Sequence, residues 1–138
     1  MSLVLDSSAT LAWIYSDEIT QPIRDVFDSL AEDGAIVPTL WRLEVANSLT
    51  MAVRRGRIDA EFRRAALADL AVLDIVADAY TDAHAWDATL ALADRHGLTI
   101  YDAAYVELAL RRGLALATLD GDMRAAGAKV GLRILGAD

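Results

Sequence analysis

The sequence predicts an α/β protein built on a parallel sheet. Short runs rich in Val, Ile and Leu alternate with longer segments of helical period, and no Gly-, Ser- or Pro-rich linker or internal repeat interrupts them. The chain has 138 residues, of which 55% are hydrophobic, and this is enough to form one core. We therefore expect a single domain spanning residues 1–138.

The expected strands are the five apolar runs at residues 3–5, 35–37, 73–76, 114–118 and 132–135. Between them, the helical period predicts helices at residues 8–15, 22–32, 40–55, 60–70, 83–96, 102–112 and 121–126. Asp59 and Thr81 are expected N-caps, and four glycines after helix ends are expected to be left-handed: Gly34, Gly56, Gly97 and Gly113. Right-handed connections then give a parallel sheet covered on both faces.

The amino-acid composition limits the kinds of site, the cellular location and the mode of nucleic-acid binding that we expect. The absence of cysteine excludes disulfides, zinc–thiolate sites and thiol nucleophiles, and it favours an intracellular protein. The first sixteen residues carry no Lys or Arg, and charges interrupt every apolar run, so we expect a cytoplasmic protein without a membrane span. The net charge of −8 argues against a protein that coats nucleic acid through its overall charge.

Four acidic residues stand out by position. Asp6 directly follows the first apolar run and Asp120 follows the fourth, so both are expected beyond the carboxyl ends of strands, where open α/β sheets place their ligands. If the first and fourth strands are neighbours, these two carboxylates meet at a switch in strand order. Glu44 and Asp102 lie in helices with mostly apolar surroundings, where a carboxylate is costly unless it is paired or binds a cation. An all-oxygen set of this kind suits Mg²⁺ or Mn²⁺ better than zinc.

Each acid also has a purely structural interpretation. Asp6 and Asp102 are plausible helix caps, Asp120 stands in a glycine-containing turn, and Glu44 has Arg42 nearby as an ion-pair partner. The positions alone do not decide between these roles and metal binding.

Polar neighbours could support the acids. Asn47 and Ser48 share a helical face with Glu44, where they could orient its carboxylate or a water. Ser7, Ser8 and Thr118 are small hydroxyl residues beside Asp6 and Asp120, and they are equally typical of caps and turns.

A basic cluster follows the predicted Glu44 helix. It consists of Arg54, Arg55 and Arg57, followed by Arg63 and Arg64. Such a cluster could guide the backbone of a nucleic acid, although a solvated face paired with Asp59, Glu61 and Asp69 is as plausible.

Taken together, four stretches resemble the PIN-domain family, and specifically VapC-like toxins of type II toxin–antitoxin modules. They are LVLDSSAT, VPTLWRLEVANSL, HGLTIYDAAYVELAL and ALATLDGDMRAAG, and each contains one of the four acids. The resemblance covers nearly the whole chain, apart from a variable region near residues 55–75.

The resemblance implies a three-layer αβα sandwich with a five-stranded parallel sheet. It also implies Mg²⁺ or Mn²⁺ held by Asp6, Glu44, Asp102 and Asp120, with Asp122 as an accessory acid and Thr118 as a supporting hydroxyl. The implied activity is endonucleolytic cleavage of RNA, and the implied partners are a small antitoxin and a second copy of the chain.

Three other protein classes are alternatives to a PIN-domain nuclease. A PIN-like scaffold that acts only through protein contacts is possible, although the complete set of acids counts against it. A receiver-like signalling domain would need paired acids near the first strand, an aspartate after a middle strand and a lysine late in the chain, and Lys129 is the only lysine available. A phosphatase of the haloacid-dehalogenase kind would need an aspartate two residues after Asp6, where Ser8 stands.

Overall fold

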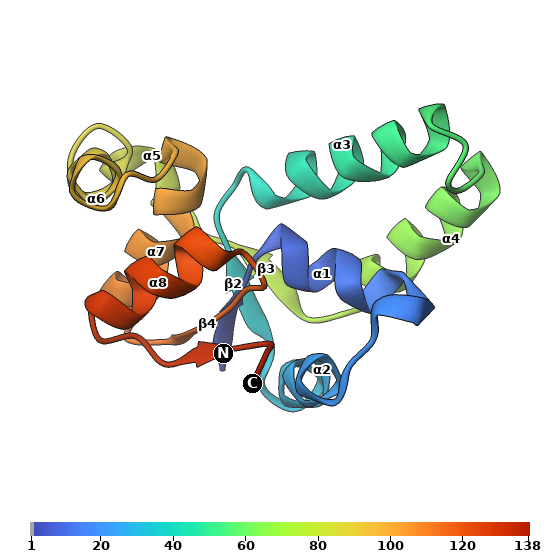
Figure 1. Ribbon diagram of the computed structural model, residues 1–138, viewed down its shortest axis with the longest axis horizontal. Coiled ribbons are helices and arrows are strands. Elements are labelled where there is room, and N and C mark those ends of the chain that lie inside the picture. Colours follow the sequence, from blue (N-terminus) through green and yellow to red (C-terminus); the bar gives the residue numbers. More distant parts are fainter. Residues whose placement is uncertain (1) are drawn as a thin grey trace.

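A computed structural model describes residues 2–138 and contains a five-stranded parallel sheet (Figure 1). The strands are β1 (Leu3–Leu5), β2 (Ala35–Val37), β3 (Ile75–Ala77), β4 (Ala115–Ala117) and β5 (Ile134–Leu135), in the spatial order β3-β2-β1-β4-β5. All four neighbouring pairs are parallel. The predicted fold class and strand number are confirmed.

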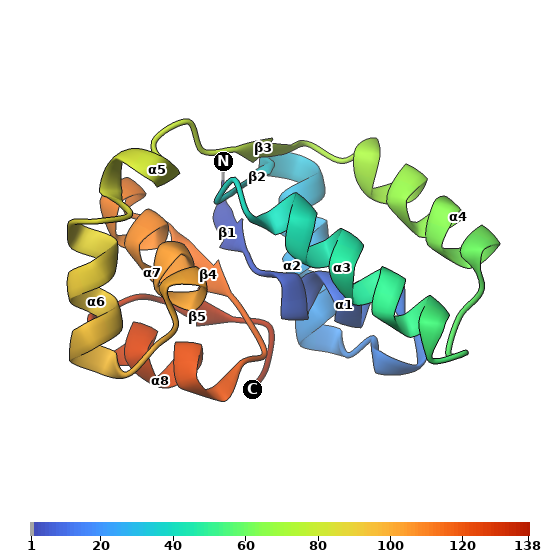
Figure 2. The ribbon, with the colours of Figure 1, turned by 90° about the horizontal axis from the view of Figure 1, so that it is seen from above.

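Helices cover both faces of the sheet. One side carries α1 (Ser7–Ile14), α2 (Gln21–Asp33), α3 (Trp41–Arg54) and α4 (Ala60–Ala71), with the short 3-10 turn η1 (Ser16–Glu18) between α1 and α2. The other side carries α5 (Thr81–His84), α6 (Ala88–His96), α7 (Ile100–Arg112) and α8 (Gly121–Lys129). Figures 1 and 2 show the two helical groups on either side of the strands, which gives three layers.

The order of the strands reverses at β1. The chain moves outward from β1 through β2 to β3, then returns to place β4 on the other side of β1. Leu5 pairs with Ala117, and the Asp6 amide donates a hydrogen bond to the Ala117 carbonyl at 3.1 Å. The first and fourth strands are therefore neighbours, and the residues that follow them meet at one edge of the sheet.

Two buried elements cross the centre of the molecule. All three residues of β1 are fully buried, as expected for a central strand with helices on both faces. Helix α7 contacts β1 and β4, and every residue from Ala103 to Ala109 is buried. Any polar group on these elements is consequently held in a fixed position.

Most of the predicted helix caps and left-handed glycines are present in the structure. Asp59 caps α4 by accepting a hydrogen bond from the Phe62 amide at 2.8 Å. The four glycines predicted to be left-handed have φ between 65° and 75°. No helix within residues 2–138 has the length and apolar character needed to cross a bilayer.

Two local predictions were wrong. The helix predicted at residues 83–96 is divided into α5 and α6, because Asp87 leaves the helical conformation with φ −126° and ψ −106°. Thr81 is the first residue of α5 and not its N-cap, since its hydroxyl bonds to Asp78. Strand β3 begins at Ile75, within two residues of its expected start, because the Leu73 amide still donates to the Leu70 carbonyl in the turn that ends α4.

Candidate metal centre

Asp6 is the buried centre of the site. It caps α1, and its Oδ1 atom accepts a hydrogen bond from the Ala9 amide at 2.8 Å. The Ser8 hydroxyl donates to the same carboxylate at 2.7 Å, and the Thr118 hydroxyl donates to Oδ2 at 2.5 Å. The residue is only 1% exposed. Three donors therefore fix the carboxylate in one orientation at the end of β1.

Asp120 approaches from the neighbouring strand. It caps α8, and its Oδ2 atom accepts from the Met123 amide at 2.9 Å. Its own amide donates to the Thr118 hydroxyl at 3.0 Å. Thr118, which is fully buried, thus connects the two acids, because it accepts from Asp120 and donates to Asp6.

Glu44 and Asp102 come from two helices. Glu44 lies in the first turn of α3 and accepts a hydrogen bond from the Tyr105 hydroxyl at 2.5 Å. Asp102 lies in the first turn of α7, and its amide donates to the hydroxyl of the N-cap Thr99 at 3.1 Å. Both acids sit at the positive ends of their helices, which favours negative charge there.

The pKa values of these acids show that they share one electrostatic environment. Burial is the largest cause that raises the pKa of Asp6, and the charge of Asp120 raises it further. Burial also raises the pKa of Glu44, with added effects from Asp102 and Asp6. Burial, Asp120 and Asp122 raise the pKa of Asp102. The charges of neighbouring acids thus act on Asp6, Glu44 and Asp102 together, and the carboxylates belong to a single cluster.

The cluster lacks a cation of its own. No lysine or arginine is among the groups that set the pKa values of Asp6, Glu44 and Asp102. Within residues 2–138, no three acidic or imidazole side chains converge closely enough to enclose an ion. Mg²⁺ commonly binds through one or two carboxylates and keeps several waters, so a set of carboxylates without His or Cys matches its preference for oxygen. The donor set fits Mg²⁺ or Mn²⁺.

The remaining predicted site residues occupy different places. Asp122 is exposed and close enough to Asp102 to raise its pKa. Ser7 is the first residue of α1, but the hydroxyl that bonds Asp6 belongs to Ser8. Asn47 is exposed one turn after Glu44, and no hydrogen bond joins these two residues in the described part of the chain.

The contact between Tyr105 and Glu44 was not predicted from the sequence. The side chain is 1% exposed, and its hydroxyl donates to Glu44 across two helices. Burial is the largest cause that raises the pKa of Tyr105, and the hydrogen bond to Glu44 raises it further, so the phenol remains a donor. The signal available in the sequence was the spacing of three residues from Asp102, which places both side chains on one helical face.

The arginine cluster is only partly paired. Arg57 lies 3.9 Å over the Tyr15 ring and pairs with Glu18 at 3.5 Å, Arg63 donates to the Thr50 hydroxyl, and Arg64 pairs with Glu61. The side chains of Arg54 and Arg55 have no hydrogen-bond or ion-pair partner within residues 2–138. The predicted pairing with acids thus holds for Glu61 and not for the whole cluster.

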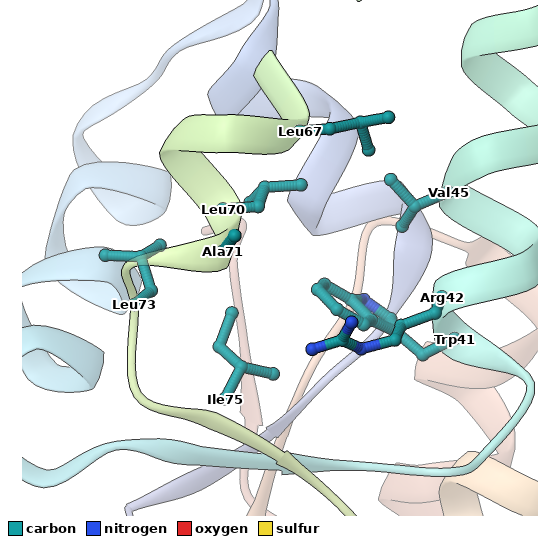
Figure 3. Close-up of a pocket in the computed structure, with 8 residues that line it drawn as sticks. All are labelled: Trp41, Arg42, Val45, Leu67, Leu70, Ala71, Leu73 and Ile75. Atoms are coloured by element: carbon teal, nitrogen blue, oxygen red, sulfur yellow. The ribbon is translucent and has the colours of Figure 1, made fainter. Parts of the chain in front are cut away.

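An apolar cavity of about 300 Å³ lies apart from the acids. Its walls come from α3, α4 and the segment leading into β3, and they comprise Trp41, Arg42, Val45, Leu67, Leu70, Ala71, Leu73 and Ile75 (Figure 3). No carboxylate lines it, so it contributes nothing to metal binding.

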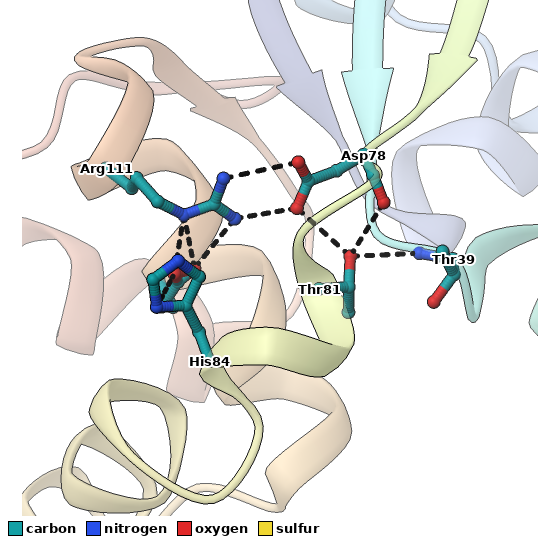
Figure 4. A network of polar contacts seen from close by, with 6 residues as sticks. Thr39, Asp78, Thr81, His84 and Arg111 are labelled. Atoms are coloured by element: carbon teal, nitrogen blue, oxygen red, sulfur yellow. Dashed lines mark hydrogen bonds and ion pairs between the residues drawn. The ribbon is translucent and has the colours of Figure 1, made fainter.

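A second group of buried acids lies at the end of β3 (Figure 4). Arg111 on α7 donates to both oxygens of Asp78, at 3.2 and 2.6 Å, and to Glu107 at 2.7 Å. The Thr81 hydroxyl donates to Asp78 at 3.1 Å and accepts from the Thr39 amide at 3.3 Å. In this group the arginine supplies the positive charge that the first cluster lacks.

Comparisons of the sequence with known proteins identify a family and a relative. A family model described as the PIN domain matches residues 3–129. Ribonuclease VapC3 of Pyrobaculum aerophilum is 33% identical over 120 residues, which cover 87% of this chain and 90% of that protein.

Solved structures share the fold. PAE2754 from Pyrobaculum aerophilum has a TM-score of 0.71 and 24% identity, covering 97% of this chain and 89% of that chain. VapC20 of Mycobacterium tuberculosis, described as a toxin that cleaves the sarcin–ricin loop, has a TM-score of 0.64 and 20% identity, covering 91% of this chain and 95% of that chain. At these identities the two structures establish a common fold.

The fold and the site define a parallel α/β protein with a carboxylate cluster at its switch point. With the family model matching most of its length, the chain belongs to the PIN-domain family.

Proposed function

We propose that this protein is a metal-dependent endoribonuclease and the toxin of a toxin–antitoxin pair. The observation that carries the proposal is the meeting of Asp6, Glu44, Asp102 and Asp120 at one edge of the sheet without a cationic partner. Acids whose pKa values are raised by burial and by neighbouring carboxylates, as those of Asp6, Glu44 and Asp102 are, lower their free energy by binding a hard divalent cation. Ribonuclease VapC3, at 33% identity, supports RNA as the substrate.

The chain's own groups prepare the site. Ser8, Thr118 and the Ala9 amide hold the Asp6 carboxylate, and Tyr105 holds one oxygen of Glu44. Mg²⁺ or Mn²⁺, when bound, would lower the pKa of a water and reduce the charge of the scissile phosphate. We assign Asp6 and Asp120 as direct ligands, and Glu44 and Asp102 as the groups that hold or deprotonate the attacking water. Asp122 is an accessory acid beside Asp102.

The proposal extends to partners. We expect a cognate antitoxin that inhibits the enzyme by placing a basic side chain among the four acids, because an arginine could satisfy several carboxylates with bidentate hydrogen bonds. A homodimer and a cytoplasmic location, both implied by the family, belong to the same proposal. The protein is expected to act as a single domain.

Conservative substitutions test the active site. Asp6→Asn, Glu44→Gln, Asp102→Asn and Asp120→Asn each remove a charge and keep the shape of the side chain. We expect each to abolish RNA cleavage in Mg²⁺ or Mn²⁺ and to shrink the rise in melting temperature on metal addition, since ligand stabilisation follows RT ln(1 + [L]/Kd). Chelation should suppress cleavage by the unaltered protein.

Asp59→Asn is the matched control. Asp59 caps α4 in the same way as Asp6 caps α1, and Asn caps a helix about as well as Asp. This variant should keep full activity and the full metal response. If Asp6→Asn behaves like Asp59→Asn in both measurements, the four acids are structural and the chain is a non-catalytic binding module.

A further inference from the structure

A second cavity of about 370 Å³ begins one helical turn from the candidate metal centre. Asn47, Ser48 and Met51 of α3 form one wall and Leu11 of α1 faces them, while Arg55 lies at the far end. Helices α1 and α3 contact each other, and Figures 1 and 2 show them side by side. The volume is within the range of sites that hold small molecules or one monomer of a polymer.

The cavity is continuous with the acids along α3. Glu44, Ser48, Met51 and Arg55 follow one another at spacings of four, three and four residues, so they share one face of the helix. The first and last of them are separated by roughly 16 Å along the helix axis. A chain molecule whose phosphate reaches Glu44 can therefore extend along this face to Arg55.

The charge of this face changes along its length. It begins at the carboxylate cluster and ends at Arg55, whose side chain has no hydrogen-bond or ion-pair partner within residues 2–138. The neighbouring Arg57 also lines the cavity, but Glu18 and the Tyr15 ring hold it in place. The free guanidinium is thus Arg55, and a phosphate is the anion that guanidinium groups bind best.

The middle of the cavity offers hydrogen-bonding groups. Asn47 is exposed and Ser48 is half-buried, and each can both donate and accept. Amide side chains recognise the polar edges of unpaired bases in single-stranded RNA. Tyr15, 8% exposed and packed under Arg57, forms a rigid floor.

We propose that this cavity is an RNA subsite for a nucleotide adjacent to the scissile phosphate. Asn47 and Ser48 contact its base, and Arg55 binds the next backbone phosphate. The inference rests on the proposed ribonuclease function and adds to it the residues that select the cleavage position. Arg54 is equally unpaired but does not line the cavity, and it has no part in the subsite.

The test compares Arg55→Met with Arg54→Met in the full-length protein. Both arginines lie at the carboxyl end of α3, so the two variants lose the same favourable interaction with the helix dipole. Cleavage of an unstructured RNA oligonucleotide in Mg²⁺ gives kcat and KM, and fluorescence anisotropy with Asp6→Asn added to each variant gives affinity without cleavage. Melting-temperature shifts in Mg²⁺ measure metal binding separately.

We expect Arg55→Met to raise KM about tenfold, the loss expected for one charge-assisted contact, while kcat and the metal shift stay unchanged. The log–log salt dependence of affinity should flatten by roughly 0.7. Arg54→Met should leave KM and the salt dependence at the values of the unaltered protein. Equal effects of the two substitutions would indicate a diffuse electrostatic contribution and would overturn the subsite.

Asn47→Ala and Ser48→Ala test base recognition. Both should change the distribution of cut positions on one long RNA, with the total rate at saturation nearly unchanged. An unchanged distribution overturns the assignment of these residues. If Arg55→Met and Asn47→Ala leave RNA cleavage intact but weaken inhibition by the antitoxin, the cavity holds a protein segment and the RNA proposal is wrong. Failure of the unaltered protein to bind or cut RNA refutes the proposed function and the subsite with it.

Discussion

Two groups of acids lie at the same edge of the sheet, and only one of them contains a basic side chain. Asp78 follows β3, as Asp6 follows β1, and both are almost completely buried. Arg111 forms ion pairs with both Asp78 and Glu107. No arginine or lysine is among the acids around Asp6. The chain supplies a counter-charge to the carboxylates at Asp78 and supplies none to those around Asp6.

The pKa values express this difference. Burial raises the pKa of Asp78, but the hydrogen bonds and charge of Arg111, together with hydrogen bonds from the Tyr80 amide and the Thr81 hydroxyl, outweigh burial and lower it. Around Asp6 the hydrogen bonds from Ala9, Thr118 and Ser8 are not sufficient to overcome burial, and the pKa is raised. Around Asp6 no arginine or lysine of the chain offsets the effect of burial, and under the proposed function a bound cation would supply that positive charge.

The largest expected effect comes from removing the internal cation. Arg111→Met should destabilise the protein by about 3–5 kcal/mol, because Asp78 and Glu107 would remain buried without a counter-charge. Chemical denaturation in urea measures this loss. Arg95→Met is the control, since Arg95 is exposed on α6 and should change stability by less than about 0.5 kcal/mol. Similar losses for both variants would mean that the network contributes nothing specific.

Neutralising one acid in each group should act in opposite directions. Without metal, Asp6→Asn should stabilise the fold by on the order of 1–3 kcal/mol, since it removes repulsion between the Asp6 carboxylate and those of Asp120 and Glu44. Asp78→Asn should destabilise it, because Arg111 loses an ionised partner. Unfolding in chelator gives both values. A stabilising Asp78→Asn, or a destabilising Asp6→Asn, would remove the distinction between the two groups.

The pH dependence should separate the groups again. The raised pKa values of Asp6, Glu44 and Asp102 mean that the folded state binds protons more tightly than the unfolded state, so metal-free stability should increase as pH falls from 7 towards their ordinary values. The lowered pKa of Asp78 gives stability that is present above its ordinary value and lost as pH falls through its folded value.

Metal-free unfolding between pH 7 and pH 3 should therefore show a rise followed by a fall. Asp6→Asn should reduce the rise, and Asp78→Asn should reduce the fall. The opposite assignment of these two changes would show that the signs of the pKa shifts are wrong.

The smallest effect is a matched loss of one hydroxyl from each group. Thr81→Val removes one hydrogen-bond donor to Asp78, but Arg111 still holds that carboxylate. The substitution should lower the free energy of unfolding by about 1 kcal/mol and leave the metal response intact. Thr118→Val removes a donor to Asp6 and the acceptor for the Asp120 amide, so it should also weaken the stabilisation by Mg²⁺. Melting curves with and without Mg²⁺ distinguish the two; an equal metal response would place Thr118 outside the site.

Much of the site was accessible from the sequence, because Asp6 and Asp120 are fixed by the strands that precede them. An acid directly after a buried apolar run has to lie at the carboxyl edge of a parallel sheet, and Glu44 and Asp102 are conspicuous as charges in apolar helices. The sequence also offered capping roles for Asp6 and Asp102 and a turn role for Asp120. Asp6 does cap α1 while belonging to the group of acids, and Asp120 caps α8, but α7 is capped by Thr99 and not by Asp102. The choice between the two interpretations was therefore unnecessary for Asp6 and Asp120.

The sequence by itself determined the α/β class, the five strands and the four acids, because periodicity and strand ends are local properties of the chain. Only the tertiary structure decided that Ser8 rather than Ser7 bonds Asp6, that Tyr105 reaches Glu44, and that Arg111 neutralises Asp78. Tyr105 and Glu44 are separated by 61 residues, and Arg111 and Asp78 by 33. Contacts of this kind depend on the rotation of each helix as it packs on the sheet, which is set by the whole core and not by any local pattern.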